Sequence, residues 1–308
     1  MINSGLIKHT LLEFNSRLST KYNCNVYLKR EDQQIVRSFK IRGAFSKINN
    51  LNPYSNIVCA SAGNHAQGVA HVCNKFNMNS TIFVPKTTPS QKIERIKYFS
   101  NTNCNLEIIG NHFSETLQHA LNYSKNTKSV FVHPYDDTQI IEGQSTIATE
   151  IFKDIQPDII MSSIGGGGLI SGLGLYGKQK NNCKIIGGEP YYCQSMKKSI
   201  LENKIININT KETFVDGATV NQVGKKTFEV CKQYVDKIYG INDGEICESL
   251  IDLYEKDGII TEPAGALPIA ILEKMKYEIK NKNVVVVVSG GNNDISRYPE
   301  IQEKYFKY

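Results

Sequence analysis

Short runs of apolar residues alternate with segments whose apolar residues recur every three or four positions. Runs such as Ile57–Ala60 and Val284–Val288 contain no polar residue, which is typical of strands buried on both faces of a parallel sheet. Segment 66–76 has the period of an amphipathic helix. The other expected strands are 26–28, 81–84, 106–109, 130–132, 159–163 and 184–186. The other expected helices are 44–52, 91–99, 113–124, 146–152, 169–178, 225–235, 246–257 and one that starts near Pro263.

This alternation occurs in two runs and predicts an α/β protein with two open, twisted, mostly parallel sheets flanked by helices. We expect a small domain over residues 55–135. A larger, discontinuous domain would consist of residues 1–54 and 136–308. A ligand cleft would lie between the two domains.

Composition excludes several classes of protein. The chain has 308 residues with 40% hydrophobic and 21% charged residues, as in ordinary globular proteins. The net charge of +6 is spread along the chain, so nucleic-acid binding is not expected. The eight cysteines form no CxxC and no metal-ligand spacing, which indicates a reducing compartment. With no signal peptide and no membrane span, we expect a cytoplasmic protein.

The stretch 38–44, Ser-Phe-Lys-Ile-Arg-Gly-Ala, places Lys40 between an aromatic and an aliphatic residue, ahead of a Gly-Ala pair that permits close packing. Two interpretations are open on this stretch alone. Desolvation lowers the pKa of an ammonium group, so a lysine held here could be an amine nucleophile or base. Alternatively, Lys40 extends from an amphipathic helix into solvent.

Segment 162–169, Ser-Ser-Ile-Gly-Gly-Gly-Gly-Leu, joins an expected strand to an expected helix. Glycines let backbone N–H groups approach an anion, and the amino end of a helix adds its dipole, so this segment predicts a phosphate-binding loop. Gly172, Gly174 and Gly177 match the dinucleotide spacing, but they fall inside the expected helix rather than after its strand. We interpret them as packing positions, with a nicotinamide-dependent oxidoreductase as the alternative.

Two further segments follow strand ends. Segment 60–68, Ala-Ser-Ala-Gly-Asn-His-Ala-Gln-Gly, could hold a carboxylate through Ser61, Asn64 and free N–H groups, or could merely cap its helix. Ser289 follows the last strand and precedes two glycines. It should share a sheet edge with the phosphate-binding loop.

Five motifs occur in a familiar order: Ser-Phe-Lys-x-Arg-Gly-Ala, Ser-Ala-Gly-Asn-His, Gly-Gly-Gly-Gly-Leu, Glu-Pro-Ala-Gly-Ala-Leu and Ser-Gly-Gly-Asn. In this the chain closely resembles the pyridoxal-phosphate threonine ammonia-lyases (threonine dehydratases), from residue 8 to residue 294. The resemblance implies the tryptophan-synthase-β-like fold, which is fold type II of pyridoxal-phosphate enzymes. Serine racemase is a near relative.

The resemblance also implies roles for residues. Lys40 would be the Schiff-base lysine and the base at Cα. The cofactor-binding residues would be Phe39, Lys40, Asn64, Gly165, Gly166, Gly167, Gly168, Leu169 and Ser289. The substrate carboxylate would be bound by Ser61, Gly63, Asn64 and His65, in a mobile small domain.

The implied reaction removes water from L-threonine, giving 2-oxobutanoate and ammonia for isoleucine biosynthesis, and converts L-serine to pyruvate. The alternatives are a serine racemase, a 3-hydroxyaspartate ammonia-lyase and, more distantly, a non-catalytic amino-acid sensor. Serine racemases resembling this chain carry a serine where Ala62 stands, so we expect little racemisation. Because Ser289 is neutral, elimination is favoured over transamination.

Departures from the family pattern set further expectations. Glu189 matches a divalent-cation ligand of serine racemase, but the segment after it lacks the second acid, so no metal site is expected. Few residues follow Asp294, so we expect no isoleucine-sensing domain and no inhibition through one. A homo-oligomer of two or four chains is expected.

Overall fold

The computed structural model describes residues 5–181 and 183–308, and the chain divides into two compact units. The smaller unit contains residues 5–8, 34–36 and 40–143. The larger unit contains residues 9–33, 37–39 and 144–308. The smaller unit therefore includes the expected 55–135 segment together with residues before and after it.

The larger unit is built on a six-stranded sheet with the order β1-β2-β10-β7-β8-β9. Only β1 is antiparallel, pairing with β2, and the other neighbours are parallel. The strands are β1 (Leu12–Phe14), β2 (Asn25–Arg30), β7 (Ile159–Ser163), β8 (Lys184–Pro190), β9 (Lys237–Ile241) and β10 (Asn283–Val288). This arrangement confirms the expected open, mostly parallel sheet.

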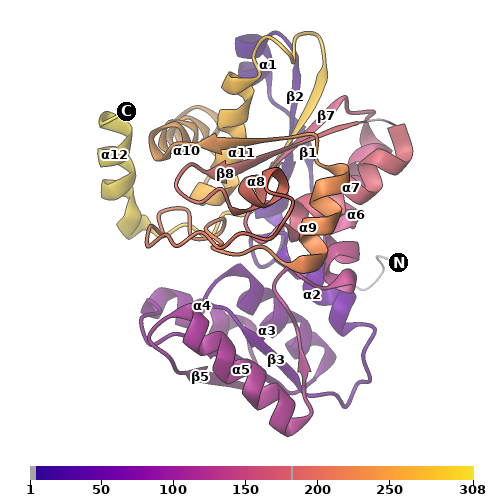
Figure 1. The fold of residues 1–308 in the computed structure, drawn as a ribbon, viewed down its shortest axis with the longest axis vertical. Helices are drawn as coiled ribbons and strands as arrows, with labels where there is room; N and C mark the ends of the chain where they lie inside the picture. Colours follow the sequence, from indigo (N-terminus) through magenta and orange to yellow (C-terminus); the bar gives the residue numbers. More distant parts are fainter. Residues whose placement is uncertain (1–4, 182) are drawn as a thin grey trace. The chain divides into compact units, whose positions relative to one another are not determined.

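Helices cover both faces of this sheet, which explains the unbroken apolar strands (Figure 1). Val284, Val286 and Val288 contact a core shared with α1, α10 and α11, whereas Val285 and Val287 contact a core shared with α6, α7 and α9. The helices are α1 (Ser16–Tyr22), α6 (Thr138–Asp154), α7 (Gly168–Asn181), α8 (Ser195–Leu201), α9 (Lys225–Tyr234), α10 (Asp243–Asp257), α11 (Pro263–Lys274) and α12 (Tyr298–Phe306). Two single 3-10 turns are η1 (Glu31–Gln33) and η2 (Ile295–Arg297).

The smaller unit has a four-stranded, fully parallel sheet with the order β5-β4-β3-β6. Its strands are β3 (Ile57–Ala60), β4 (Ser80–Val84), β5 (Cys104–Ile108) and β6 (Val130–Phe131). Its helices are α2 (Lys40–Ile48), α3 (Asn64–Phe76), α4 (Ser90–Phe99) and α5 (Phe113–Thr127). One core lies between β3, β4 and helices α2 to α4, and a smaller one lies beneath α5. The two sheets together confirm the α/β fold class.

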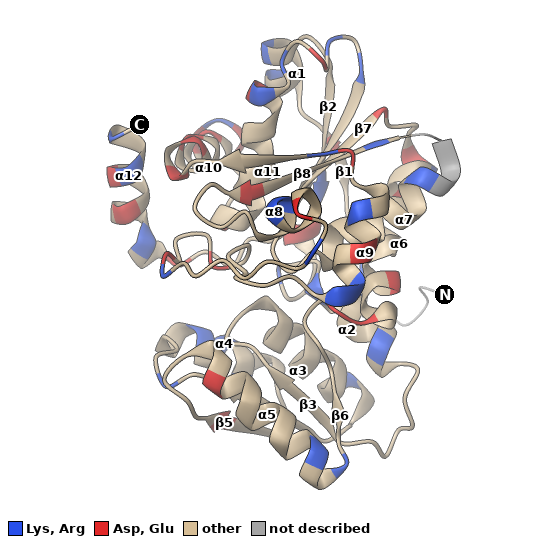
Figure 2. Ribbon diagram, in the orientation of Figure 1, with Lys and Arg blue, Asp and Glu red and all other residues tan. Residues whose placement is uncertain are grey.

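Charged residues of both signs are scattered over the helices of both units (Figure 2). Among residues 5–181 and 183–308, no helix is both long and apolar enough to cross a membrane. The eight cysteines are free thiols, and all but the partly exposed Cys104 are buried.

Candidate active site

The predicted phosphate-binding loop and Ser289 lie at the same edge of the larger sheet. Strands β7 and β10 are parallel neighbours, with Ile160 opposite Val285 and Met161 opposite Val286. Segments that follow the two strands therefore begin side by side at the carboxyl edge, where open α/β sheets bind ligands. This confirms the shared edge expected from the sequence.

Close contacts in the phosphate-binding loop leave no room for a side chain at Gly167. Gly167 has φ +90°, and a Cβ on it would lie 2.6 Å from Met196 Cε and 3.0 Å from Thr227 Cβ. Thr227 Oγ1 donates a hydrogen bond to Gly166 O at 2.7 Å, which fixes the orientation of that peptide. Helix α7 begins at Gly168, so its first N–H groups have no partner within the helix. A side-chain-free turn ahead of a helix amino end fits the phosphate of pyridoxal 5′-phosphate.

Segment 38–39 of the larger unit is anchored beside Ser289. The Phe39 N–H donates to Ser289 O at 3.1 Å, and Ser38 forms a β-bridge with Gly290. Lys40 is the next residue in the chain. Ser289 is 2% exposed, and its hydroxyl is 3.4 Å from Ala264 O, a long hydrogen bond that can be exchanged for a better partner.

Glu262 is a residue at this edge that the sequence did not single out, although it begins one of the five motifs. It is 7% exposed and precedes α11, and a Cβ on Gly290 would lie 2.6 Å from its Oε1. The carboxylate thus lies against the turn that follows Ser289. The available signal was its position before Pro263, which marks a helix start but not the direction of the side chain.

Lys40 is the first residue of α2, and its side chain is partly buried. Its Nζ donates to Pro134 O at 2.8 Å, just beyond β6. Helix α2 is closely packed here, since a Cβ on Gly68 of α3 would lie 3.3 Å from the Ile41 backbone. A Cβ on Gly143 would lie 2.7 Å from Gly43 Cα, so the Gly-Ala pair does serve close packing.

The predicted carboxylate-binding segment is an open turn at the amino end of α3. Ser61 Oγ accepts the Gly63 N–H at 3.2 Å, and the first helical bond runs from Gln67 N–H to Gly63 O at 3.3 Å. The N–H groups of Asn64 and His65 precede that bond and are geometrically unable to join the helix ladder. No atom lies within 4 Å of a Cβ built on Gly63, so a small ligand has room there.

The imidazole of His65 is a structural group. It is 3% exposed, and its Nε2 donates to Val132 O at 2.9 Å. Burial, and after it the nearby Lys40 ammonium, lowers the pKa of His65 from 6.5 to about 3. His65 is therefore neutral, and only its backbone N–H is suited to bind a carboxylate.

Glu189 caps a helix. Its Oε1 accepts the Met196 N–H at 2.8 Å and its Oε2 accepts the Lys197 N–H at 2.9 Å, at the start of α8. Burial raises the pKa of Glu189 to about 7, against the lowering effect of these hydrogen bonds. In the part of the chain that the structure describes, no group of three or more His, Cys, Asp or Glu residues is arranged to hold a metal ion.

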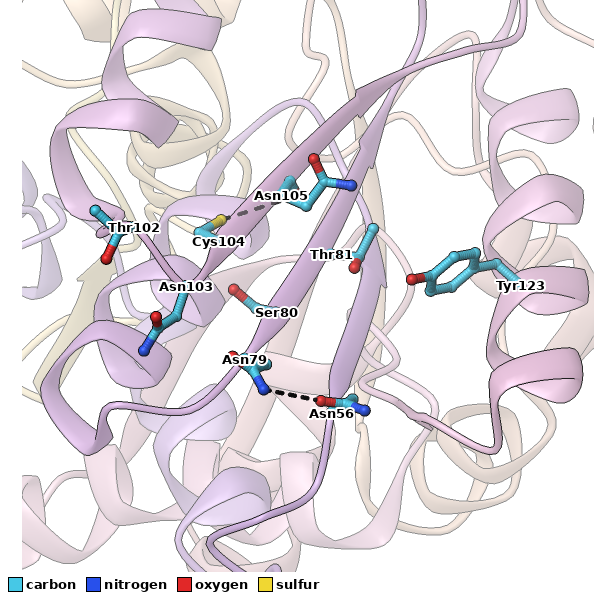
Figure 3. Close-up of a pocket in the computed structure, with 9 residues that line it drawn as sticks. All are labelled: Asn56, Asn79, Ser80, Thr81, Thr102, Asn103, Cys104, Asn105 and Tyr123. Atoms are coloured by element: carbon cyan, nitrogen blue, oxygen red, sulfur yellow. Dashed lines mark hydrogen bonds between the residues drawn. The ribbon is translucent and has the colours of Figure 1, made fainter.

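A polar hollow of about 410 Å³ lies elsewhere in the smaller unit (Figure 3). Its lining residues are Asn56, Asn79, Ser80, Thr81, Thr102, Asn103, Cys104, Asn105 and Tyr123. They belong mostly to the amino ends of β3, β4 and β5, opposite the edge at which α/β sheets bind ligands.

The glycines Gly174 and Gly177 face Tyr234 and Ile185 from within α7, which confirms their interpretation as packing positions.

Known proteins match this chain over nearly its whole length. A family model described as pyridoxal-phosphate dependent enzyme matches residues 4–290. The biosynthetic L-threonine dehydratase of Halalkalibacterium halodurans is 45% identical over 98% of this chain and 74% of its own length. That of Staphylococcus epidermidis is 46% identical over 97% of the chain and 74% of its own length.

Solved structures of a threonine deaminase and a serine racemase are also similar to this chain. Processed threonine deaminase isoform 2 of Solanum lycopersicum has a TM-score of 0.93 and 36% identity, covering 97% of this chain and 88% of its own. Serine racemase of Dictyostelium discoideum has a TM-score of 0.87 and 28% identity, covering 94% of this chain and 95% of its own. These matches confirm the resemblance and fold type II.

Proposed function

The chain belongs to the pyridoxal-phosphate-dependent enzymes and, among them, to the threonine dehydratases, and from this premise we propose that it is a threonine ammonia-lyase. L-Threonine would lose water and give 2-oxobutanoate and ammonia, and L-serine would give pyruvate. The observation that best supports the proposed role of Lys40 is the position of Phe39, the residue before it. Phe39 is hydrogen-bonded to Ser289 at the edge that bears the phosphate-binding loop, and Lys40 follows it directly.

Each part of the cofactor has a candidate partner. Gly165 to Leu169 would hold the phosphate, Phe39 would lie against the ring, and Asn64 would bond the phenolic oxygen. Ser289 would face the ring nitrogen, and Lys40 would be the covalent attachment point. Bound pyridoxal 5′-phosphate supplies an electron-withdrawing ring that stabilises negative charge at the amino acid's Cα.

Lys40 is the proposed base. Its side chain is partly buried and already donates to a backbone oxygen, so its amine is held in one place rather than moving in solvent. Once released from the cofactor, this amine takes the Cα proton. The N–H groups of Gly63, Asn64 and His65, with the Ser61 hydroxyl, hold the substrate carboxylate and orient that proton.

The outcome at Cα is elimination without racemisation. Ala62 has no proton to deliver, so Lys40 is the proposed acid and base on its own. Ser289 is neutral and stabilises a protonated ring less than a carboxylate would. Loss of the β-hydroxyl is therefore favoured over prolonged storage of charge at Cα.

Assay of keto acid tests this proposal. Purified holoenzyme is supplied with L-threonine, L-serine and 3-hydroxyaspartate, and D-serine is measured in parallel. We expect keto acid from threonine and serine, little D-serine, and no turnover by Lys40→Ala. Lys47→Ala is the matched control, because Lys47 lies on the same helix and pairs with Asp137 at 2.9 Å. Failure to release keto acid from threonine, or substantial D-serine, would overturn the proposal.

We further propose a cytoplasmic homo-oligomer of two or four chains. Apolar side chains are exposed near the carboxyl end, including Ile295 at 83% and Phe306 at 81%. Contact between subunits would remove such side chains from water. Light scattering that gave the mass of one chain at all concentrations would contradict an oligomer.

A further inference from the structure

Residues 214–220 form an irregular segment, here called the brace, that packs against the phosphate-binding loop. A Cβ on Gly165 would lie 3.1 Å from Ala218 Cα, 3.1 Å from Gly217 O and 3.3 Å from Val220 Cγ2. The loop and the brace are therefore in direct backbone contact at Gly165. The position of the brace limits the conformations that the loop can adopt.

The brace also contacts the start of α11. A Cβ on Gly217 would lie 2.9 Å from Ala264 Cβ and 3.5 Å from Glu262 Oε1. Ala264 O in turn accepts the Ser289 hydroxyl. The brace thus lies between the phosphate-binding loop and the residues around Ser289.

Side chains from other elements hold the brace, which belongs to no strand. Its own regularity is one turn, in which Thr219 N–H donates to Val215 O at 2.8 Å. The Tyr192 hydroxyl accepts the Val215 N–H at 2.9 Å, and the Ser195 hydroxyl donates to Val220 O at 2.7 Å. Phe214, Val215 and Ala218 are also buried in the core of the larger unit, so the brace is held by these hydrogen bonds together with that packing.

Arg297 holds the amino end of the brace. It ends η2, directly before α12, and its Nη2 donates to Phe214 O at 2.6 Å. Its guanidinium carbon lies 5.2 Å from the centre of the Phe214 ring, and its Nη1 lies 3.9 Å from Asp216. Lys304 of α12 lies 4.8 Å from the same ring centre. Figure 1 shows α12 near the loops that join α8 to α9.

We propose that Arg297 is a positioning residue for the cofactor phosphate, which fixes Phe214 and so keeps the brace against Gly165. The inference rests on the proposed role of Gly165 to Leu169 as the phosphate-binding loop. An arginine suits this task because its planar group can donate to a carbonyl while it stacks on a ring. The start of the carboxyl-terminal helix thereby sets the affinity of the loop.

Titration with two ligands tests the inference. Apoenzyme is titrated with pyridoxal 5′-phosphate and separately with pyridoxal, which lacks the phosphate, and visible absorbance is followed. For Arg297→Gln we expect about tenfold weaker binding of pyridoxal 5′-phosphate, the effect of losing one charge-assisted hydrogen bond. Binding of pyridoxal should weaken much less, because the brace reaches the residues around Ser289 only through the start of α11. Arg297→Lys should give an intermediate result, because it keeps the charge without the planar fork.

Arg17→Gln is the matched control. The Arg17 side chain is 25% exposed against 23% for Arg297, and it pairs with Asp257 and Asp252 rather than with the brace. This variant should bind both ligands as the wild type does. Thermal unfolding followed by circular dichroism confirms folding, and if Arg297→Gln does not unfold cooperatively, Arg297→Lys decides.

Equal weakening for both ligands, or no change for either, would overturn the inference. Gly167→Ala separates this failure from failure of the proposed function. If Gly167→Ala weakens only pyridoxal 5′-phosphate and Arg297→Gln does not, the loop holds the phosphate and Arg297 is not its positioning residue. If Gly167→Ala changes both ligands equally, the role of the loop itself is wrong, and the inference fails with it.

Discussion

At the scale of single residues, His65 and Lys40 share one end of the smaller unit but have opposite electrostatic roles. The buried His65 imidazole is kept neutral by burial and by the Lys40 ammonium. In the proposed site, a neutral His65 adds no second cation beside the substrate carboxylate, which would be bound by backbone N–H groups. The sequence predicted a polar cluster here, but not that the imidazole is directed to Val132 O.

The low pKa of His65 predicts a pH dependence of stability. In the unfolded chain His65 binds a proton below about pH 6.5, whereas in the folded chain it does so only near pH 3. The unfolded state binds more protons between these values, so stability falls as pH decreases from about 6.5 towards 3. His65→Gln keeps an N–H donor without titrating, and its unfolding free energy should fall less steeply over this range.

Urea unfolding at a series of pH values measures this difference. His112→Gln is the control, because the His112 side chain is 69% exposed and its ion-pair partner is the neighbouring Glu115. Its curve should parallel that of the wild type. Equal pH slopes for wild type and His65→Gln would contradict a neutral, buried His65.

At the scale of elements, the apolar pattern correctly predicted the strands and helices whose own residues are buried in a regular pattern. The expected strand 159–163 is β7, and the helix expected from 169 begins one residue earlier as α7. The pattern missed β1, which has three residues, and β9, an edge strand whose side chains are half exposed. Their pairing is set by neighbouring strands rather than by their own composition.

Helix α6 shows why boundaries were harder to predict. The pattern indicated residues 146–152, whereas the helix runs from Thr138 to Asp154. Gly143 disfavours a helix locally, but a side chain there would overlap Arg42 O, 2.5 Å from its Cβ. Close contact with α2 therefore explains why position 143 is a glycine within a helix. The sequence alone does not show this contact.

Alanine at two glycine positions of the smaller unit should have opposite effects, one on KM and the other on stability. Gly63→Ala meets no neighbouring atom, so stability should fall by less than about 1 kcal/mol, whereas KM for threonine should rise about tenfold as the methyl group intrudes on the carboxylate. Gly68→Ala presses on the Lys40–Ile41 backbone and should cost about 1–3 kcal/mol of stability. Urea unfolding and steady-state kinetics measure the two effects. An unchanged KM in Gly63→Ala would exclude this turn as the carboxylate site.

At the scale of the whole molecule, a buried ionic network joins segments of the larger unit that are far apart in sequence. Lys29 of β2 is bonded to Glu150 of α6 at 2.7 Å, with side chains 0% and 1% exposed. Lys29 also donates to Thr10 O at 2.7 Å, and the Thr10 hydroxyl donates to Glu31 at 2.6 Å. Nothing in the sequence around Lys29 indicates a partner 121 residues away.

Breaking this pair should be costly. Glu150→Gln leaves the Lys29 ammonium buried without its counter-ion and should destabilise the protein by about 3–5 kcal/mol. Replacing both partners, as Lys29→Met with Glu150→Leu, should recover most of that loss. Glu273→Gln, which breaks an exposed pair with Lys276, should change stability by less than about 1 kcal/mol. Chemical unfolding that ranked the double variant below Glu150→Gln would contradict a penalty from unpaired burial.

The attachment of the cofactor to Lys40 is the central claim, and one measurement tests it most directly. Holoenzyme is reduced with borohydride and digested, and the peptide that carries the pyridoxyl group is sequenced by mass spectrometry. We predict that the group is on Lys40 and that Lys40→Ala, folded as judged by circular dichroism, carries none. A pyridoxyl group on any other lysine of the wild type would contradict the account.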